Sequence, residues 1–285
     1  MTKLRIFGRL HADNRLTLRA GYTLDRLQPP RSTEPTDLYA EVHDAEGTVL
    51  LREPVMTKPY SEGSDLAVRG SVTLPDQAAH VVLLRTDSSG LPPVEVARLD
   101  VPPSAPDVRL DEAPTGDVEG TQRIAWSADG DPAPVEYLVD YSHDNGETWL
   151  PIGERTTAME TSVDLDAMPG GERCRVSVTA TNGVRSQTVV SNPFRIQPKP
   201  CRALIHHPID GTTVPSELLL RGNGWWLEES RPETESIVWT SDVDGELGRG
   251  MVIPVQLTTG HHRLTLTAGT HERRGTESVE IDVAS

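Results

Sequence analysis

The stretch VEYLVDYSHDNGETW, residues 135–149, carries the pattern that decides the fold. In its first half a valine or tyrosine stands at every second position from Val135 to Tyr141. Successive side chains of a strand point to opposite faces, so these residues would share one face of an extended segment. The Asp-Asn-Gly that follows favours a tight turn, and Trp149 opens the returning segment. The stretch therefore predicts a β-hairpin.

The turn of this hairpin also matches a known motif. It spells S-x-D-x-G-x-T-W, the Asp-box of sialidases and related β-propellers, and the five positions are Ser142, Asp144, Gly146, Thr148 and Trp149. A propeller needs repeats of about 40–50 residues, and a sialidase carries several boxes, whereas this sequence has one full box. We therefore interpret the motif as a structural turn. Asp144 is expected to accept backbone N–H groups of the turn, Gly146 to supply a positive φ, and Trp149 to pack beneath it, mostly buried.

The rest of the sequence has the same character. Short runs rich in Val, Leu, Ile and Thr recur between Gly, Pro, Asp and Asn, and the 285 residues include 23 glycines and 23 prolines. Such a composition is typical of all-β proteins. A chain of this length holds two or three domains.

Two proline-rich stretches divide the chain. They are DVPPSAPDV, residues 100–108, and FRIQPKPC, residues 194–201. Proline removes a backbone donor and fixes φ, so such stretches end strands and stiffen linkers. The resulting segments, 1–102, 103–198 and 199–285, each have about the length of one sandwich. The sequence thus predicts three tandem antiparallel β-sandwich domains.

The middle segment resembles a fibronectin type III domain. The resemblance rests on Trp126 in a strand, the tyrosine-bearing strand above, and Leu165 followed by Pro169-Gly170 before an alternating strand that ends in Asn-Gly. Fibronectin domains have a corner tyrosine where Cys174 stands here. By this resemblance the hydroxyl anchor of the corner is missing.

The last segment resembles immunoglobulin-like modules akin to polycystic-kidney-disease repeats, with Trp239 on its aromatic-bearing strand. The whole chain resembles the C-terminal region of bacterial zinc metallopeptidase-like proteins. That likeness rests on the order of seven short motifs: RIFGRL, DAEGTVL, YSHDNGETW, PGGERCRVSVTATNG, HPIDGT, WTSDVDGELGRG and TGHHRLTLTA. The resemblance implies accessory, non-catalytic modules.

Charge and hydropathy exclude several classes of partner. The net charge of −16 would repel nucleic acid and anionic membranes. No run of 18 apolar residues predicts a membrane span. The beginning of the chain lacks the apolar core of a signal peptide, so a cytoplasmic location is expected unless another export route serves the protein. Two cysteines, Cys174 and Cys201, cannot build a multi-disulfide scaffold, although one bridge stays open.

Catalytic motifs are absent from the sequence, and we expect no enzyme. The zinc motif H-E-x-x-H, the nucleophile elbow and the phosphate loop do not occur. The adjacent histidines 206–207 and 261–262 would point to opposite faces of a strand, so neither pair can chelate a metal through both rings. A site that joins the two pairs, or a cryptic hydrolase, stays an alternative.

Calcium is the one cofactor that the sequence leaves open. Asp242, Asp244 and Glu246 are spaced like ligands of a hard cation, and Asp129 with Asp131 forms a second acidic pair. Neither cluster completes an EF-hand, and carboxylates in turns often cap backbone amides instead. We therefore expect no cofactor, with calcium as the alternative.

A binding surface is the remaining candidate. Trp225 and Trp226 are consecutive, so in a strand one ring faces inward and the other outward. An exposed tryptophan near Arg231 could stack on a sugar or fill a pocket of a partner. The sequence predicts a non-catalytic interaction or spacer module that binds protein, partnered with a metallopeptidase or a larger assembly. Carbohydrate binding is the alternative.

Overall fold

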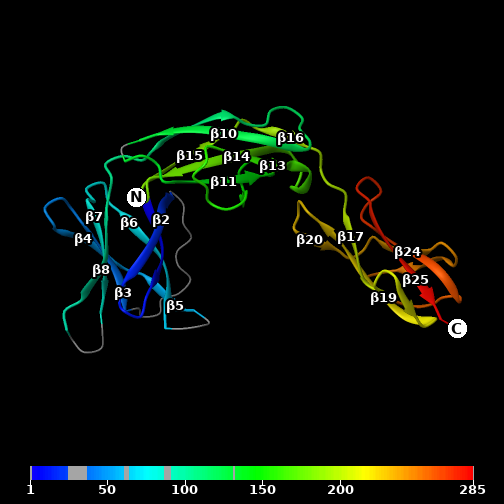
Figure 1. Ribbon diagram of the computed structural model, residues 1–285. Helices are drawn as coiled ribbons and strands as arrows, with labels where there is room; N and C mark the ends of the chain where they lie inside the picture. The colour runs from blue at the N-terminus through cyan, green and yellow to red at the C-terminus, as the bar shows by residue number, and fades with distance from the viewer. Residues whose placement is uncertain (1, 25–36, 61–63, 87–90, 131, 285) are drawn as a thin grey trace.

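The computed structural model describes residues 2–24, 37–60, 64–86, 91–130 and 132–284. Within these ranges the regular structure consists of strands and one short 3-10 turn. The strands form six sheets, and three hydrophobic cores lie along the chain. Figure 1 shows the three sandwiches in chain order. The all-β fold of tandem antiparallel sandwiches is confirmed.

The first sandwich pairs a sheet of order β2-β1-β6-β5 with one of order β4-β3-β7-β8. Its strands are β1 (Thr2–Leu10), β2 (Leu16–Leu24), β3 (Leu38–His43), β4 (Val49–Pro54), β5 (Met56–Pro59), β6 (Leu66–Leu74), β7 (His80–Arg85) and β8 (Val94–Asp100). Alternate residues from both sheets, such as Leu4, Val72 and Leu83, are fully buried between them. The alternation of apolar residues therefore sets which face of each strand packs inward.

The second sandwich packs a sheet of order β13-β10-β9 on one of order β12-β11-β14-β15, with β16 also paired to β14. Its elements are β9 (Asp107–Glu112), β10 (Thr121–Asp129), β11 (Glu136–Ser142), β12 (Leu150–Pro151), β13 (Glu160–Asp164), η1 (Leu165–Ala167), β14 (Gly171–Thr181), β15 (Ser186–Val190) and β16 (Phe194–Ile196). The opening stretch forms β11 and its turn. Tyr137, Val139 and Tyr141 are buried on one face as predicted, whereas Val135 lies before the strand and is exposed.

A tyrosine hydroxyl does anchor this sandwich, contrary to the sequence-based expectation. Tyr141 donates its hydroxyl to the backbone carbonyl of Pro169. Its oxygen also lies 3.2 Å from the sulfur of Cys174. The anchoring hydroxyl thus comes from the neighbouring strand, since Tyr141 lies on β11 and Cys174 on β14, and the two strands pair. Both cysteines of the chain are buried and free.

The third sandwich pairs a sheet containing β17, β19, β20 and β23 with one of order β18-β25-β24-β21-β22. Its strands are β17 (Arg202–His207), β18 (Thr212–Val214), β19 (Glu217–Trp226), β20 (Arg231–Glu233), β21 (Ile237–Ser241), β22 (Gly245–Arg249), β23 (Val252–Gln256), β24 (Gly260–Ala268) and β25 (Gly275–Val283). β17 lies in the first of these sheets, and β18 pairs parallel to β25 in the second. The chain thus crosses from one sheet to the other between Pro208 and Gly211.

Backbone and core contacts join the first two sandwiches. The N–H of Gly21 donates to the carbonyl of Gly183 at 2.8 Å. Thr23 and Ser186 each donate a backbone N–H to the other's side-chain oxygen at 2.9 Å. Val184, 4% exposed, belongs to the core of the first sandwich. A Cβ on Gly21 would lie 2.9 Å from the Gly183 carbonyl oxygen, so the approach requires glycine at this position.

The carboxylate of Glu228 links the second and third sandwiches. Glu228 accepts the backbone N–H of Gly170 at 3.0 Å and that of Lys199 at 2.7 Å, and it pairs with Arg273. Arg273 also donates to the carbonyl of Lys199 at 2.9 Å. Burial would raise the pKa of Glu228, but these hydrogen bonds outweigh it and hold the pKa below its usual value.

Candidate functional site

The Asp-box turn is held by its own side chains. Asp144 accepts the backbone N–H of Thr148 at 2.9 Å and the hydroxyl of Ser142 at 2.7 Å. The Ser142 oxygen accepts the N–H of Gly146 at 2.7 Å, and Gly146 has a φ of 93°. Burial opposes ionisation of Asp144, yet the hydrogen bonds from Thr148 and Ser142 lower its pKa to about 2. The predicted bond from Asp144 to an amide of its own turn is confirmed.

Trp149 is less buried than expected. Its ring is 36% exposed and packs over Gly146, where an added Cβ would lie 3.3 Å from a ring carbon. Trp149 is not part of the buried core of the second sandwich, and its ring covers the turn at the surface. This arrangement fits a structural turn.

The candidate calcium residues each have a partner within the protein. Asp242 accepts the backbone N–H of Arg263 at 2.7 Å, and Glu246 pairs with Arg249. Asp244 accepts the backbone N–H and the hydroxyl of Thr258 at 3.0 and 2.9 Å. In the part of the chain that the structure describes, no three His, Cys, Asp or Glu side chains form a group that could hold a metal ion. Asp131 lies outside the described residues, and the calcium alternative stays a prediction.

The two histidine pairs lie on different sheets. His206 and His207 end β17, and His261 and His262 lie on β24. His262 is fully buried and bonds to Ser241, whereas the exposed His261 bonds to an aspartate of β25. The adjacent rings on β24 thus face opposite sides, as the sequence predicts.

The tandem tryptophans also face opposite sides. Trp226 is 3% exposed and donates its indole N–H to Glu233 at 2.9 Å. The guanidinium of Arg273 lies 4.7 Å from the centre of its ring. Trp225 is 36% exposed, on the outer face of β19, where its cross-strand neighbours are Arg202 and Pro232. Of the two rings, Trp225 is therefore the one that a ligand can reach.

Arg231 is exposed at the start of β20 and pairs with Trp226 across the strands. The pKa of Glu233 is lowered chiefly by the hydrogen bond from the backbone N–H of Ser236. The positive charge of Arg231 lowers it further. Arg231 and Trp225 thus lie on adjacent strands at the end of the sheet nearest the second sandwich.

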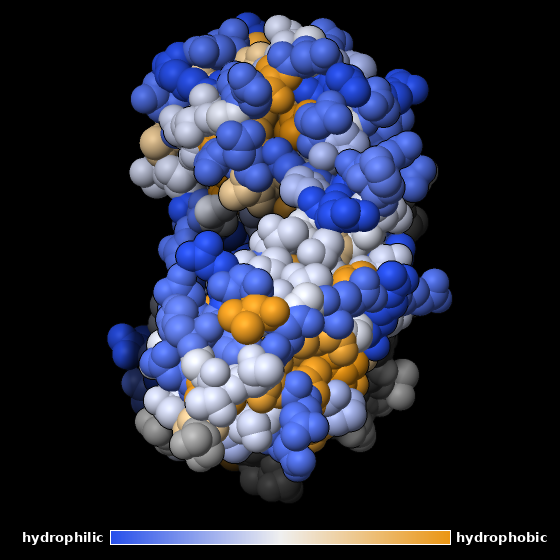
Figure 2. Space-filling model, turned by 90° about the vertical axis from the view of Figure 1, so that its right-hand side faces the viewer, coloured by the Kyte–Doolittle hydropathy of each residue, from blue (hydrophilic) through white to orange (hydrophobic). Residues whose placement is uncertain are grey.

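The third sandwich has a groove of about 1270 Å³, here called the C-terminal groove. Four strands, β17, β18, β19 and β23, contribute to its walls. Its lining residues are His206, His207, Ile209, residues 212–215, residues 217–219, Arg221 and residues 254–256. In Figure 2 the third sandwich forms the lower part of the visible face, where hydrophobic residues are exposed among hydrophilic ones. No sequence motif marks this groove, because its residues come from four separate segments.

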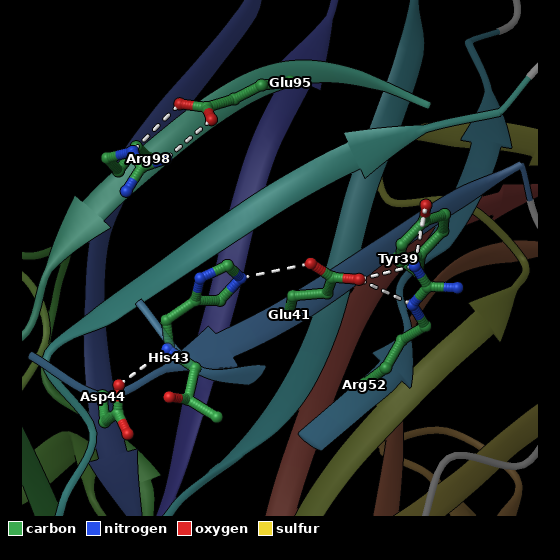
Figure 3. Close-up of polar contacts among 8 residues, drawn as sticks. Tyr39, Glu41, His43, Asp44, Arg52, Glu95 and Arg98 are labelled. Carbon is green, nitrogen blue, oxygen red and sulfur yellow. Dashed lines mark hydrogen bonds and ion pairs between the residues drawn. The ribbon is translucent and has the colours of Figure 1, made fainter. Parts of the chain in front are cut away.

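A network of charges covers the outer face of the first sandwich (Figure 3). Glu41 lies between His43 at 3.1 Å and Arg52 at 2.9 Å, and the Arg52 guanidinium lies 4.1 Å from the centre of the Tyr39 ring. Burial would raise the pKa of Glu41, but the hydrogen bonds from Arg52 and His43 lower it. The charges of this network are therefore matched within the protein, which fits a structural role.

A second groove, of about 860 Å³, lies between the first two sandwiches. Burial raises the pKa of Asp140 on its wall. Glu136 pairs with Arg155 at 3.1 Å, and Arg155 donates to the carbonyl of Ala20 at 2.6 Å. This arrangement ties the two sandwiches together.

Solved structures provide the comparisons with known proteins, since no family model and no curated protein matches the chain. The chain is similar to the fibronectin(III)-like modules of Clostridium thermocellum CbhA (13% identity, TM-score 0.25, 62% of this chain and 94% of that chain). It is also similar to extracellular domains 3-5 of Drosophila OTK (14%, 0.23, 90% and 89%). A third is the FN1-FN3 portion of chicken CNTN1 (14%, 0.21, 87% and 91%). Within the described ranges, no helix has the length and hydrophobicity that a membrane crossing requires.

Proposed function

We propose that this protein is a non-catalytic spacer and interaction module. In this proposal the first two sandwiches form one rigid arm that carries the third, and the third binds a protein partner through its β17–β19–β23 sheet. The domain boundaries are those predicted from the proline-rich stretches, near residues 102 and 198. The resemblance seen in the sequence makes a metallopeptidase-like protein or a larger assembly the class of partner that we propose.

The joint between the first two sandwiches supports the spacer role. Flexible neighbours in a tandem array touch only through a linker, whereas here Val184 is buried in the core of the preceding sandwich. The paired bonds between Thr23 and Ser186 fix the direction of the contact. A joint with both a buried apolar residue and reciprocal hydrogen bonds resists bending, because bending would expose apolar surface to water and break the hydrogen bonds.

Small-angle X-ray scattering of the full chain tests this role. We expect the wild-type curve to fit a fixed arrangement of the first two sandwiches and the Val184→Asp variant to require a broader distribution of shapes. Val190→Asp is the matched control, because Val190 ends the strand β15 that follows Val184 and is 43% exposed. Circular dichroism verifies that each variant is folded. A wild-type curve as broad as that of Val184→Asp would contradict the spacer role.

Glycan binding is a second candidate, which Trp225 favours. Its ring is exposed and Arg202 lies beside it, an arrangement suited to stacking on a sugar and donating hydrogen bonds. A glycan array with wild type and Trp225→Ala tests this function. Binding that disappears in Trp225→Ala would support it, and an array without signal for the wild type would exclude it.

A further inference from the structure

One segment of β19 has an uncovered edge. β17 pairs with β19 only over residues 221–225, and β23 pairs with it over residues 217–221 on the other side. Beyond His207 the chain crosses to the opposite sheet, where β18 pairs with β25. Among the described strands, none therefore pairs with Glu217–Leu220 on the side from which β17 has departed.

The register shows which backbone groups face this gap. Gly222 donates its N–H to Met251, and Leu257 donates to Ser216, so even-numbered residues of β19 bond toward β23. Residues of a strand alternate in the direction of their backbone bonds. The N–H and C=O groups of Leu219 and Glu217 consequently point into the gap.

Side chains around the gap offer both apolar and cationic contacts. Ile209 is 68% exposed and Leu219 43% exposed, and both line the C-terminal groove with Pro254. Arg221 and His207 lie at the end of the gap where β17 stops, and they face each other across the two strands. An occupant thus meets apolar side chains in the middle and nitrogen donors at one end.

Two positive charges lie on the outer face of the sheet beside the gap. The chain has a net charge of −16, and about half of its arginines, among them Arg52, Arg123 and Arg195, pair with carboxylates. Arg202 and Arg221, on the outer face of this sheet, form no ion pair among the described residues. Unpaired arginines in an otherwise acidic protein favour an acidic partner, since opposite charges guide binding and fix register.

We propose that an extended, acidic peptide segment of a protein partner adds to β19 at Glu217–Leu220 as an antiparallel strand. This inference rests on the proposed interaction function and names its surface. Following the direction of β17, the N-terminal end of the peptide lies beside Arg221 and carries Asp or Glu. Apolar residues follow along Leu219 and Ile209, and the C-terminal end lies next to Glu217, where a further carboxylate would be repelled. Main-chain bonds supply affinity in strand addition, and side chains supply specificity.

Selection from a displayed library of random dodecapeptides on the full chain tests the proposal. We expect enriched peptides with acidic residues first and alternating apolar residues after them. Arg221→Glu should weaken their binding at least tenfold, and Arg249→Glu, on the other sheet, should leave it unchanged. Binding should also slow amide exchange at Leu219 and Glu217.

Two further probes separate strand addition from binding by charge alone. Leu219→Pro removes the N–H that faces the gap without removing a bond to β23, and circular dichroism checks its fold. N-methylation of the peptide removes the matching donors. Each change should weaken binding at least tenfold, and full binding by the N-methylated peptide would overturn strand addition.

Other results of these experiments would overturn the proposal that an acidic peptide binds at β19. A selection without enrichment, or enrichment of basic peptides, would overturn the proposal. A wild-type dimer in sedimentation that Leu219→Pro abolishes would replace the peptide by a second copy of the chain. All these results leave the scattering test of the spacer role untouched, so the two failures can be told apart.

Discussion

Glu228 of the third sandwich accepts the backbone N–H of Gly170 in the second, 58 positions earlier in the chain, at 3.0 Å. The same oxygen accepts the N–H of Lys199 in the linker. One carboxylate of the third sandwich thus holds both the linker and the loop of the second sandwich that contains Gly170. We therefore expect the joint between the second and third sandwiches to depend on the ionisation of this group.

Glu228→Gln should loosen this joint and lower stability by about 1–3 kcal/mol, because a charged acceptor of two backbone N–H groups is lost. The lowered pKa of Glu228 means that its contribution is present above its usual pKa and is lost as the pH falls through the lower folded value. Scattering and thermal unfolding between neutral and acidic pH measure both effects. Glu229→Gln, at an exposed neighbour that also pairs with Arg273, should change stability by less than about 1 kcal/mol.

Tyr141→Phe should destabilise the second sandwich by about 1–3 kcal/mol, because the buried carbonyl of Pro169 loses its donor. Urea unfolding followed by tryptophan fluorescence measures the change. The control is Tyr137→Phe, since Tyr137 lies on the same face of β11 and its hydroxyl has no hydrogen-bond partner among the described residues. Equal losses in the two variants would contradict the anchoring role.

Asp144→Ala should destabilise the same sandwich by about 1–2 kcal/mol through the loss of hydrogen bonds to a charged group. Because the pKa of Asp144 is lowered to about 2, this stabilisation is complete at pH values above the usual pKa of aspartate and is lost as the pH falls toward 2. The stability difference from wild type should therefore shrink in strong acid. Glu147→Ala removes an exposed carboxylate of the same turn and should have no measurable effect, whereas a loss equal to that of Asp144→Ala would argue against the turn bonds.

Trp226→Ala should cost about 3–5 kcal/mol and unfold the third sandwich first, because a buried ring and its bond to Glu233 are lost. Trp225→Ala should change stability by less than about 1 kcal/mol, as for other surface substitutions. Chemical denaturation of both variants measures the contrast. Similar losses would mean that Trp225 also has a structural role.

The sequence predicted the features that depend only on residues close together in the chain. Alternation placed Tyr137, Val139 and Tyr141 on a buried face and separated Trp225 from Trp226, because the period of a strand is fixed by its backbone. The Asp-box residues predicted their own hydrogen bonds because all partners lie within one turn.

Features that depend on distant segments could not be read in this way. The bond from Tyr141 to Pro169 spans 28 positions, and nothing near Cys174 shows that a neighbouring strand supplies the hydroxyl. The uncovered edge of β19 exists because the chain leaves β17 for the other sheet, which depends on the pairing of β18 with the last strand. The sequence around Arg221 does not show that this arginine forms no ion pair with a carboxylate of the described residues.

The parallel pairing of β18 with β25 has a mechanical consequence. The chain enters the third sandwich ahead of β18 and leaves it after β25, and these strands run in the same direction over Thr212–Val214 and Ile281–Val283. Tension applied to the two ends would pull them in opposite directions along their axes, so their hydrogen bonds are loaded in shear and must break together. A stretched chain should therefore hold this sandwich folded to higher force than an arrangement that opens one bond at a time, and single-molecule pulling would measure that force.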